Sequence, residues 1–173
     1  PATFDVSVWE FFLPMIAGAE LVMAPPGAHR DPSAIAALVR RHAITTLHFV
    51  PSMLSVFLEV AGRERISRMD KVRIISTTGE ALPPGVAAET RELFPGADLY
   101  NLYGPTEAAV EITYAHLDTV GDTVPIGVPV WNSTAYVLDG RLHRVAPGVA
   151  GELYVLGPAL SRGYLDKPGL TAA

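Results

Sequence analysis

The stretch "YNLYGPTEAAVE", residues 100–111, decides the fold. Its apolar and aromatic start is typical of a β-strand, and the Gly-Pro pair that follows turns the chain. A hydroxyl and two carboxylates then come within a few residues, at Thr106, Glu107 and Glu111. Ligands of open α/β sheets bind beyond the carboxyl ends of strands, so this turn is a candidate binding site. On residue types alone, an exposed turn and helix explains the stretch equally well.

Strands and helices alternate before this stretch. Asp31-Pro32 is typical of a helix start, and apolar residues at helical spacing continue the helix to about residue 42. The predicted strands are 44–50, 72–77 and 97–103, with helices after Pro51 and from about 83 to 93. The alternation predicts an α/β fold with a mostly parallel sheet flanked by helices.

The ends of this α/β part are less regular. Ser7-x-x-Glu10 is a capping-box pattern that predicts a helix from Val8, and Gly18 is a natural stop. Residues 19–24 then alternate like a strand. Beyond residue 118 the pattern changes to short strands separated by Gly, Pro and Asp turns. We therefore predict an α/β subdomain over 1–118 and a smaller β-rich subdomain, a distorted barrel, over 119–173.

Composition limits the possible partners and compartment. The 173 residues carry a net charge of −5, which gives no basic surface for nucleic acid or anionic lipid, so we expect neither as partner. The absence of cysteine excludes disulfides and thiolate metal sites and fits a cytoplasmic protein. The chain begins with Pro1 and becomes core-like within a few residues, so we expect an excised fragment.

Three motifs resemble those of one protein family. "NLYGPTEAAVE" at 101–111 closely resembles the Tyr-Gly-Pro-Thr-Glu signature of the adenylate-forming, or AMP-binding, superfamily. "FDVSVWEFFLPMIAGAELV" at 4–22 and "GELYVLGPALSRGYLDKPGLT" at 151–171 resemble motifs of the adenylation domains of nonribosomal peptide synthetases. "TTGEALPP" at 77–84 and "VPIGVPVWN" at 124–132 lie between them in the family's order. The resemblance implies a central fragment of the N-terminal part of such an enzyme, incomplete at both ends.

This resemblance implies an ATP-dependent ligase reaction in two halves. An amino acid carboxylate attacks the α-phosphate of ATP in the presence of Mg²⁺, and a phosphopantetheine thiol on a peptidyl carrier protein then accepts the acyl group. Condensation domains of the parent synthetase are further implied partners. Thr106 and Glu107 are the implied catalytic residues, with Glu107 on the metal. The implied nucleotide-binding residues are Gly79, Glu80, Ala81, Asn101, Tyr103, Gly104 and Thr106.

The resemblance also implies an amino-acid pocket in which Asp5 binds the α-ammonium group. The other implied pocket residues are Val6, Trp9, His48, Ser76, Thr78, Leu102, Val110 and Glu111. Trp9 limits the volume, while His48, Thr78 and Glu111 can hydrogen-bond a hydroxyl or an amine. Most of these residues resemble the serine-activating pattern. Ser76 and Glu111 depart from it, so 2,3-diaminopropionate stays open as an alternative substrate.

Two other functions stay open at this stage. An acyl- or aryl-CoA ligase of the same superfamily would offer no ammonium to Asp5, and a noncatalytic binding or docking module would keep the fold alone. "ISTTGEA" at 75–81 has one glycine and no following lysine, so it does not match the superfamily's phosphate loop. Because that loop and the family's C-terminal lysine are expected outside this chain, we predict that the isolated chain is inactive.

Overall fold

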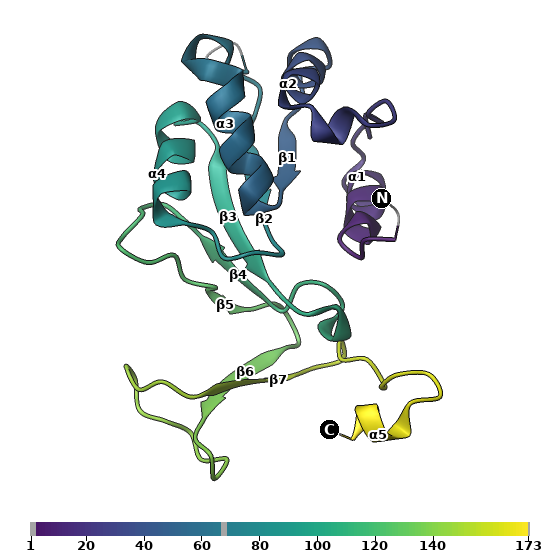
Figure 1. Ribbon diagram of the computed structural model, residues 1–173, viewed down its shortest axis with the longest axis vertical. Coiled ribbons are helices and arrows are strands. Elements are labelled where there is room, and N and C mark those ends of the chain that lie inside the picture. Colours follow the sequence, from purple (N-terminus) through teal and green to yellow (C-terminus); the bar gives the residue numbers. More distant parts are fainter. Residues whose placement is uncertain (1–2, 67–68, 173) are drawn as a thin grey trace.

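The centre of the fold is a mixed sheet of five strands, in the order β1-β2-β3-β4-β5. The computed structural model describes residues 3–66 and 69–172, with the backbone alone at 60–66 (Figure 1). The strands are β1 (Thr46–Phe49), β2 (Ile74–Thr77), β3 (Asp98–Tyr103), β4 (Thr113–His116) and β5 (Val128–Pro129). The pairings β1–β2 and β2–β3 are parallel, whereas β3–β4 and β4–β5 are antiparallel. The predicted parallel arrangement is therefore confirmed for the first three strands only.

Two helices separate the three parallel strands, as the alternation predicted: α3 (Pro51–Ile66) follows β1 and α4 (Pro84–Leu93) follows β2. The helices α1 (Ser7–Ala17) and α2 (Pro32–Arg41) precede β1, and the 3-10 turns are η1 (Ala28–Arg30) and η2 (Thr106–Ala108). Asp31 caps α2 because its side chain accepts hydrogen bonds from the Ser33 and Ala34 nitrogens. Gly18 ends α1 in the left-handed conformation, with φ of 64°. Within the described residues, none of the helices has the length and hydropathy of a membrane span.

The hydrophobic core lies between the sheet and the helices α2, α3 and α4. Leu54 and Phe57 of α3 have no exposed surface, and Ile75 of β2 and Leu99 of β3 are 1% exposed. The Phe57 ring packs 5.1 Å from the Phe49 ring of β1. Each such side chain contributes about 1.5–3 kcal/mol to folding. This core fixes the strands whose ends carry the predicted site.

The second sheet is smaller than the predicted barrel. It consists of β6 (Thr134–Leu138) paired antiparallel with β7 (Glu152–Leu156), and a four-residue helix, α5 (Pro168–Thr171), follows. β5, which was expected in the β-rich part, pairs with β4 of the first sheet instead. Two strands do not close a barrel, so the described residues contain a two-stranded ribbon in its place. Figure 1 shows this ribbon below the five-stranded sheet.

Two local predictions near the N-terminus are wrong. Residues 19–24 form no strand, because no neighbouring strand in the described structure accepts their backbone hydrogen bonds. Ser7 is the first residue of α1 rather than its cap, since Val6 holds the cap position in a helical conformation. The Ser7 nitrogen donates a hydrogen bond to the Phe4 carbonyl, and the Val8 nitrogen donates to the Asp5 carbonyl. The first turn of the helix therefore begins earlier than predicted.

Candidate functional site

Three parallel strands bring the predicted pocket residues to one edge of the sheet. The register pairs His48 of β1 with Ser76 of β2, and Thr78 follows at the end of β2. Leu102 and Tyr103 are the last residues of β3. Because parallel strands end at the same edge, these side chains from distant parts of the sequence meet there. Ser76 and Thr78 are buried, and Leu102 is half-buried.

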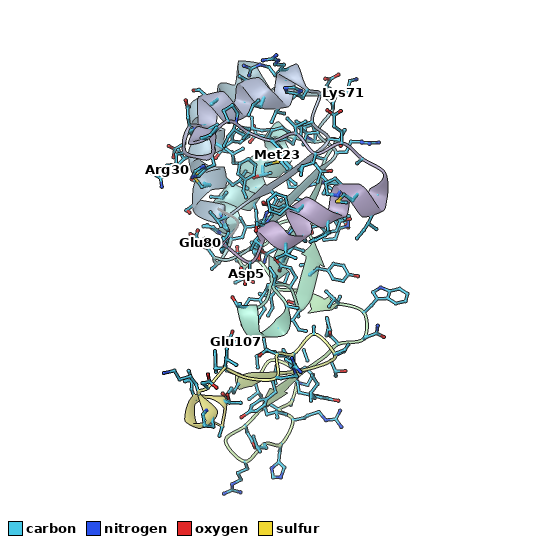
Figure 2. The ribbon with its side chains drawn as sticks, turned by 90° about the vertical axis from the view of Figure 1, so that its right-hand side faces the viewer. Asp5, Met23, Arg30, Lys71, Glu80 and Glu107 are labelled. Carbon is cyan, nitrogen blue, oxygen red and sulfur yellow. The ribbon has the colours of Figure 1, made fainter. Side chains whose placement is uncertain are left out.

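Asp5 and Thr106 are in direct contact. The Thr106 hydroxyl donates a hydrogen bond of 2.5 Å to Asp5 Oδ2, although the two residues are 101 positions apart. The other oxygen, Oδ1, accepts the Val6 nitrogen at 2.9 Å, which fixes the carboxylate at the start of α1. Figure 2 shows Asp5 at the lower edge of the α/β layer, just above the η2 turn that carries Glu107. The predicted ammonium and phosphate positions therefore adjoin.

Glu107 lies between the two sheets. Its carboxylate accepts a short hydrogen bond from the Tyr164 hydroxyl, and its carbonyl accepts the Ser161 nitrogen at 2.7 Å. The Tyr164 hydrogen bond holds the pKa of Glu107 below its ordinary value. Among the described residues no group of three or more metal-ligating side chains occurs. One ionised carboxylate suits Mg²⁺ that takes its other oxygens from phosphate and water, as in many nucleotide sites.

Several residues of the predicted pocket carry buried polar atoms without partners. Trp9 Nε1, His48 Nε2 and both carboxylate oxygens of Glu111 are buried, and none has a hydrogen-bond partner in the described part of the chain. The Trp9 and His48 rings meet edge to face, with centroids 4.8 Å apart. Buried polar atoms left unpaired cost free energy, so this arrangement suits a ligand with a polar side chain.

Glu10 is a pocket neighbour that the sequence analysis missed. Its Oε1 lies 2.9 Å from His48 Nδ1, and the two residues are 38 positions apart. A carboxylate only accepts hydrogen bonds, so His48 Nδ1 carries the hydrogen. When the ring is neutral, the buried and unpaired Nε2 is then a hydrogen-bond acceptor. The Ser-x-x-Glu pattern had marked Glu10 as a helix-capping residue instead.

Glu111 is the most perturbed acid of the site. Burial raises its pKa from 4.5 to about 7, and the negative charge of Asp5 adds to the rise. The Thr78 hydroxyl lies near enough to oppose this rise, although it makes no hydrogen bond of normal geometry to either oxygen. The segment before Glu111 is strained, because Val110 has φ of 79° and Ala109 has φ of 54°. Val6, also assigned to the pocket, is 3% exposed.

The predicted nucleotide residues have more varied surroundings. The Glu80 carboxylate accepts the Ser52 nitrogen and hydroxyl at the start of α3. Gly79 adopts φ of 82°, which favours glycine, and Ala81 lines a cavity of about 360 Å³ beside Glu80. The Tyr103 ring is 40% exposed and accessible to a planar ligand.

Two of these nucleotide residues have structural partners. Asn101 is 4% exposed, and its amide donates to the Pro125 carbonyl and accepts from the Thr77 hydroxyl. A direct contact between this side chain and a base would require those bonds to break, so its assigned role stays a prediction. Gly104 lies where a Cβ would come within 2.8 Å of Glu111 Cα. Its lack of a side chain thus lets the turn fold back on the residues that follow.

Comparison with known proteins identifies the family. The family model of AMP-binding enzymes matches residues 1–165. Enterobactin synthase component F of Escherichia coli O157:H7 is 48% identical over 180 residues, which cover 100% of this chain and 14% of that protein. Vanchrobactin synthetase VabF of Vibrio anguillarum is 44% identical over 181 residues, covering 99% of this chain and 6% of the relative. The chain thus spans a small part of the curated relatives that it matches.

Solved structures agree with this match. The nonribosomal peptide synthetase FmoA3 in an AMPPNP-bound form has a TM-score of 0.88 and 29% identity, covering 97% of this chain and 18% of that chain. The same synthetase in an α-methyl-L-serine-AMP-bound form has a TM-score of 0.87 and 29% identity, covering 97% of this chain and 20% of that chain. The chain therefore belongs to the family of AMP-binding enzymes and corresponds to a segment of the adenylation domains of nonribosomal peptide synthetases.

Proposed function

We propose that this chain forms the amino-acid and phosphate subsites of an adenylation domain that converts a small, hydroxyl-bearing amino acid into its aminoacyl-AMP. The observation that carries the proposal is the 2.5 Å contact between Thr106 Oγ1 and Asp5 Oδ2. Asp5 can pair with an α-ammonium group, and Thr106 can donate to a phosphate oxygen. Their contact would bring the carboxylate of the amino acid next to the α-phosphate of ATP.

Each group then has a defined task. Asp5 holds the ammonium through a charge-assisted hydrogen bond, which directs the substrate carboxylate at the phosphorus. The carboxylate oxygen forms the new bond to phosphorus, the bond to the bridging oxygen breaks, and pyrophosphate leaves. Thr106 orients the phosphate, Glu107 would hold Mg²⁺, and the Tyr103 ring would stack on the adenine. When bound, Mg²⁺ neutralises charge on the transferred phosphate.

The polar atoms of the pocket favour a hydroxyl over an amine. His48 Nε2 accepts and Trp9 Nε1 donates, and both are unpaired in the described structure. A serine hydroxyl can donate to the first and accept from the second, whereas an ammonium group can only donate. Serine is accordingly the proposed substrate. The α-methyl-L-serine-AMP bound to FmoA3, at 29% identity, supports a substrate of this size. The buried carboxylate of Glu111 is the observation that favours 2,3-diaminopropionate as the second candidate.

The proposal includes the partners of the second half-reaction. Relatives such as enterobactin synthase component F are much longer than the matched segment. We infer that a peptidyl carrier protein with its phosphopantetheine thiol receives the aminoacyl group and that condensation domains use it. An acyl- or aryl-CoA ligase is disfavoured because its substrates offer no cation to Asp5. A noncatalytic docking module is also disfavoured, because it would not need an ammonium site at Asp5 beside a phosphate site at Thr106.

Amino-acid-dependent exchange of pyrophosphate into ATP tests the proposal in the intact domain that carries this chain. We expect serine to exceed alanine by about 100-fold or more in kcat/KM, because alanine leaves His48 and Trp9 unpaired. Leucine or phenylalanine as best substrate would refute the pocket assignment. A preference for 2,3-diaminopropionate would make it the substrate in place of serine and would assign the contact with its side-chain amine to Glu111.

Asp5→Asn tests the ammonium site separately. The variant keeps the shape of the side chain but loses its charge, so kcat/KM for the amino acid should fall by about 100-fold or more while the KM for ATP changes little. Asp31→Asn is the matched control, because asparagine caps α2 as well as aspartate does. Equal activity of Asp5→Asn and wild type would remove Asp5 from the site.

A further inference from the structure

We propose that Tyr164 is a positioning residue that holds the Glu107 carboxylate in place for a nucleotide-bound divalent cation. The inference rests on the proposed function, because it requires MgATP to bind at Glu107. Tyr164 lies in the segment that follows β7, whereas Glu107 lies in η2, 57 positions earlier. No property of the sequence "SRGYLDKP" at 161–168 identified this tyrosine as part of the site.

Two hydrogen bonds attach Glu107 to the 161–164 turn. The Tyr164 hydroxyl donates to Glu107 Oε1, and the Ser161 nitrogen donates to the Glu107 carbonyl at 2.7 Å. One bond therefore fixes the backbone of Glu107 and the other fixes its side chain. Because the Tyr164 hydroxyl donates to Oε1, a cation would bind through Oε2.

The turn that carries Tyr164 is itself fixed by hydrogen bonds. The Tyr164 nitrogen donates to Thr171 Oγ1 at 2.9 Å, and the Thr171 hydroxyl donates to the Lys167 carbonyl at 3.0 Å. The Lys167 nitrogen donates to the Tyr164 carbonyl at 3.1 Å. Gly163 has φ of 120°, and a Cβ there would come within 2.7 Å of Thr171 Oγ1. The phenol is thus presented by a closed turn that only glycine at 163 permits.

Such a contact has a defined effect on a metal ligand. Groups that hydrogen-bond a ligating carboxylate fix its orientation, and removing them weakens metal affinity by about 10–100-fold. Glu107 is the metal ligand that the resemblance implies, and its side chain is exposed, so its orientation depends on such a partner. Because Tyr164 belongs to the segment after the second sheet, that segment contributes to the nucleotide site through Glu107.

The test measures Mn²⁺ binding by electron paramagnetic resonance in the intact domain saturated with a nonhydrolysable ATP analogue. Tyr164→Phe keeps the ring and removes the hydroxyl, so the Mn²⁺ dissociation constant should rise by about 10–100-fold. The affinity for the analogue without metal should stay unchanged, which a general loss of structure would not allow. Tyr154→Phe is the matched control, since Tyr154 donates a similar hydrogen bond to Glu152 on β7, in the second sheet.

A second variant separates positioning from simple contact. Thr171→Val leaves the phenol intact but removes the two hydrogen bonds that the Thr171 hydroxyl makes in this turn, so it should weaken Mn²⁺ binding in the same direction and by less. Unchanged Mn²⁺ affinity in Tyr164→Phe overturns the inference and leaves the proposed function standing. Absence of nucleotide-dependent Mn²⁺ binding in the wild type would overturn both.

Discussion

Glu111 links the chemistry of the pocket to its stability. Burial raises its pKa to about 7 in the folded protein, against 4.5 for the exposed side chain. The unfolded chain therefore releases this proton at lower pH than the folded protein does. Below pH 4.5 Glu111 does not lower the free energy of unfolding. Between pH 4.5 and about 7 the free energy of unfolding falls as pH rises, and above about 7 the whole loss is present.

We predict that Glu111→Gln removes this part of the pH dependence. At pH 8 the variant should be more stable than wild type by about 1–2 kcal/mol, a value that allows for solvent screening of a partly exposed group. At pH 4.5 the difference should be small. Urea unfolding across this pH range measures the effect, with Glu89→Gln on the exposed surface of α4 as control. A parallel pH profile for wild type and Glu111→Gln would contradict the raised pKa.

The sequence predicted the site residues that belong to motifs, but it missed residues that reach the site only through contacts made in the folded chain. Asp5 and Glu107 belong to recognisable stretches, and the structure brings Asp5 to Thr106 beside Glu107. Glu10 and Tyr164 reach His48 and Glu107 from 38 and 57 positions away. Such partners depend on how the chain folds back on itself, and no local pattern encodes them. The roles given to the motif residues stay predictions until they are tested.

At the scale of elements, the turn after β3 depends on close backbone packing. The Ile112 nitrogen donates to the Tyr103 carbonyl at 2.8 Å, so the chain folds directly back over Gly104. A Cβ at Gly104 would lie 2.8 Å from both Glu111 Cα and the Ile112 nitrogen, which is closer than van der Waals contact allows. The neighbouring atoms are backbone, so the turn itself must move.

Gly104→Ala should therefore destabilise the protein by about 1–3 kcal/mol and weaken ATP binding, because Thr106 and Glu107 lie in the same turn. Gly85→Ala in α4 is the control, since a Cβ there meets nothing, and alanine should stabilise the helix by up to about 1 kcal/mol. Chemical denaturation and nucleotide titration of both variants measure the two effects. Wild-type stability in Gly104→Ala would show that the turn has room to relax.

Strands were harder to predict than helices for a physical reason. The Asp31 cap and the Gly18 stop are local, and both helix boundaries followed from them. A strand needs a partner, and alternation at 19–24 does not supply one. The same reason explains the missing barrel, because β5 found its partner in β4 rather than in the ribbon of β6 and β7.

At the scale of the whole molecule, α1 presents an apolar surface to solvent. Phe12 is 55% exposed, Met15 73% and Ile16 82%, and Leu21 and Met23 beyond the helix are also exposed. A single exposed aliphatic residue is ordinary, but several exposed apolar side chains on one helix and the segment after it favour association. This surface predicts poor solubility of the isolated chain.

We predict that the purified 173-residue chain binds the dye ANS and self-associates through α1. Replacing Met15 and Ile16 with lysine should lower the dye fluorescence and shift the sedimentation profile toward the monomer, because two charges interrupt the surface. Leu165→Lys is the control, since Leu165 is 89% exposed but lies outside this surface and its replacement should change neither signal. If the wild-type chain sediments as a monomer without dye binding, the α1 surface is not the cause of association. If the α1 and Leu165 variants lower both signals equally, general exposure of apolar side chains causes the association, whichever segment carries them.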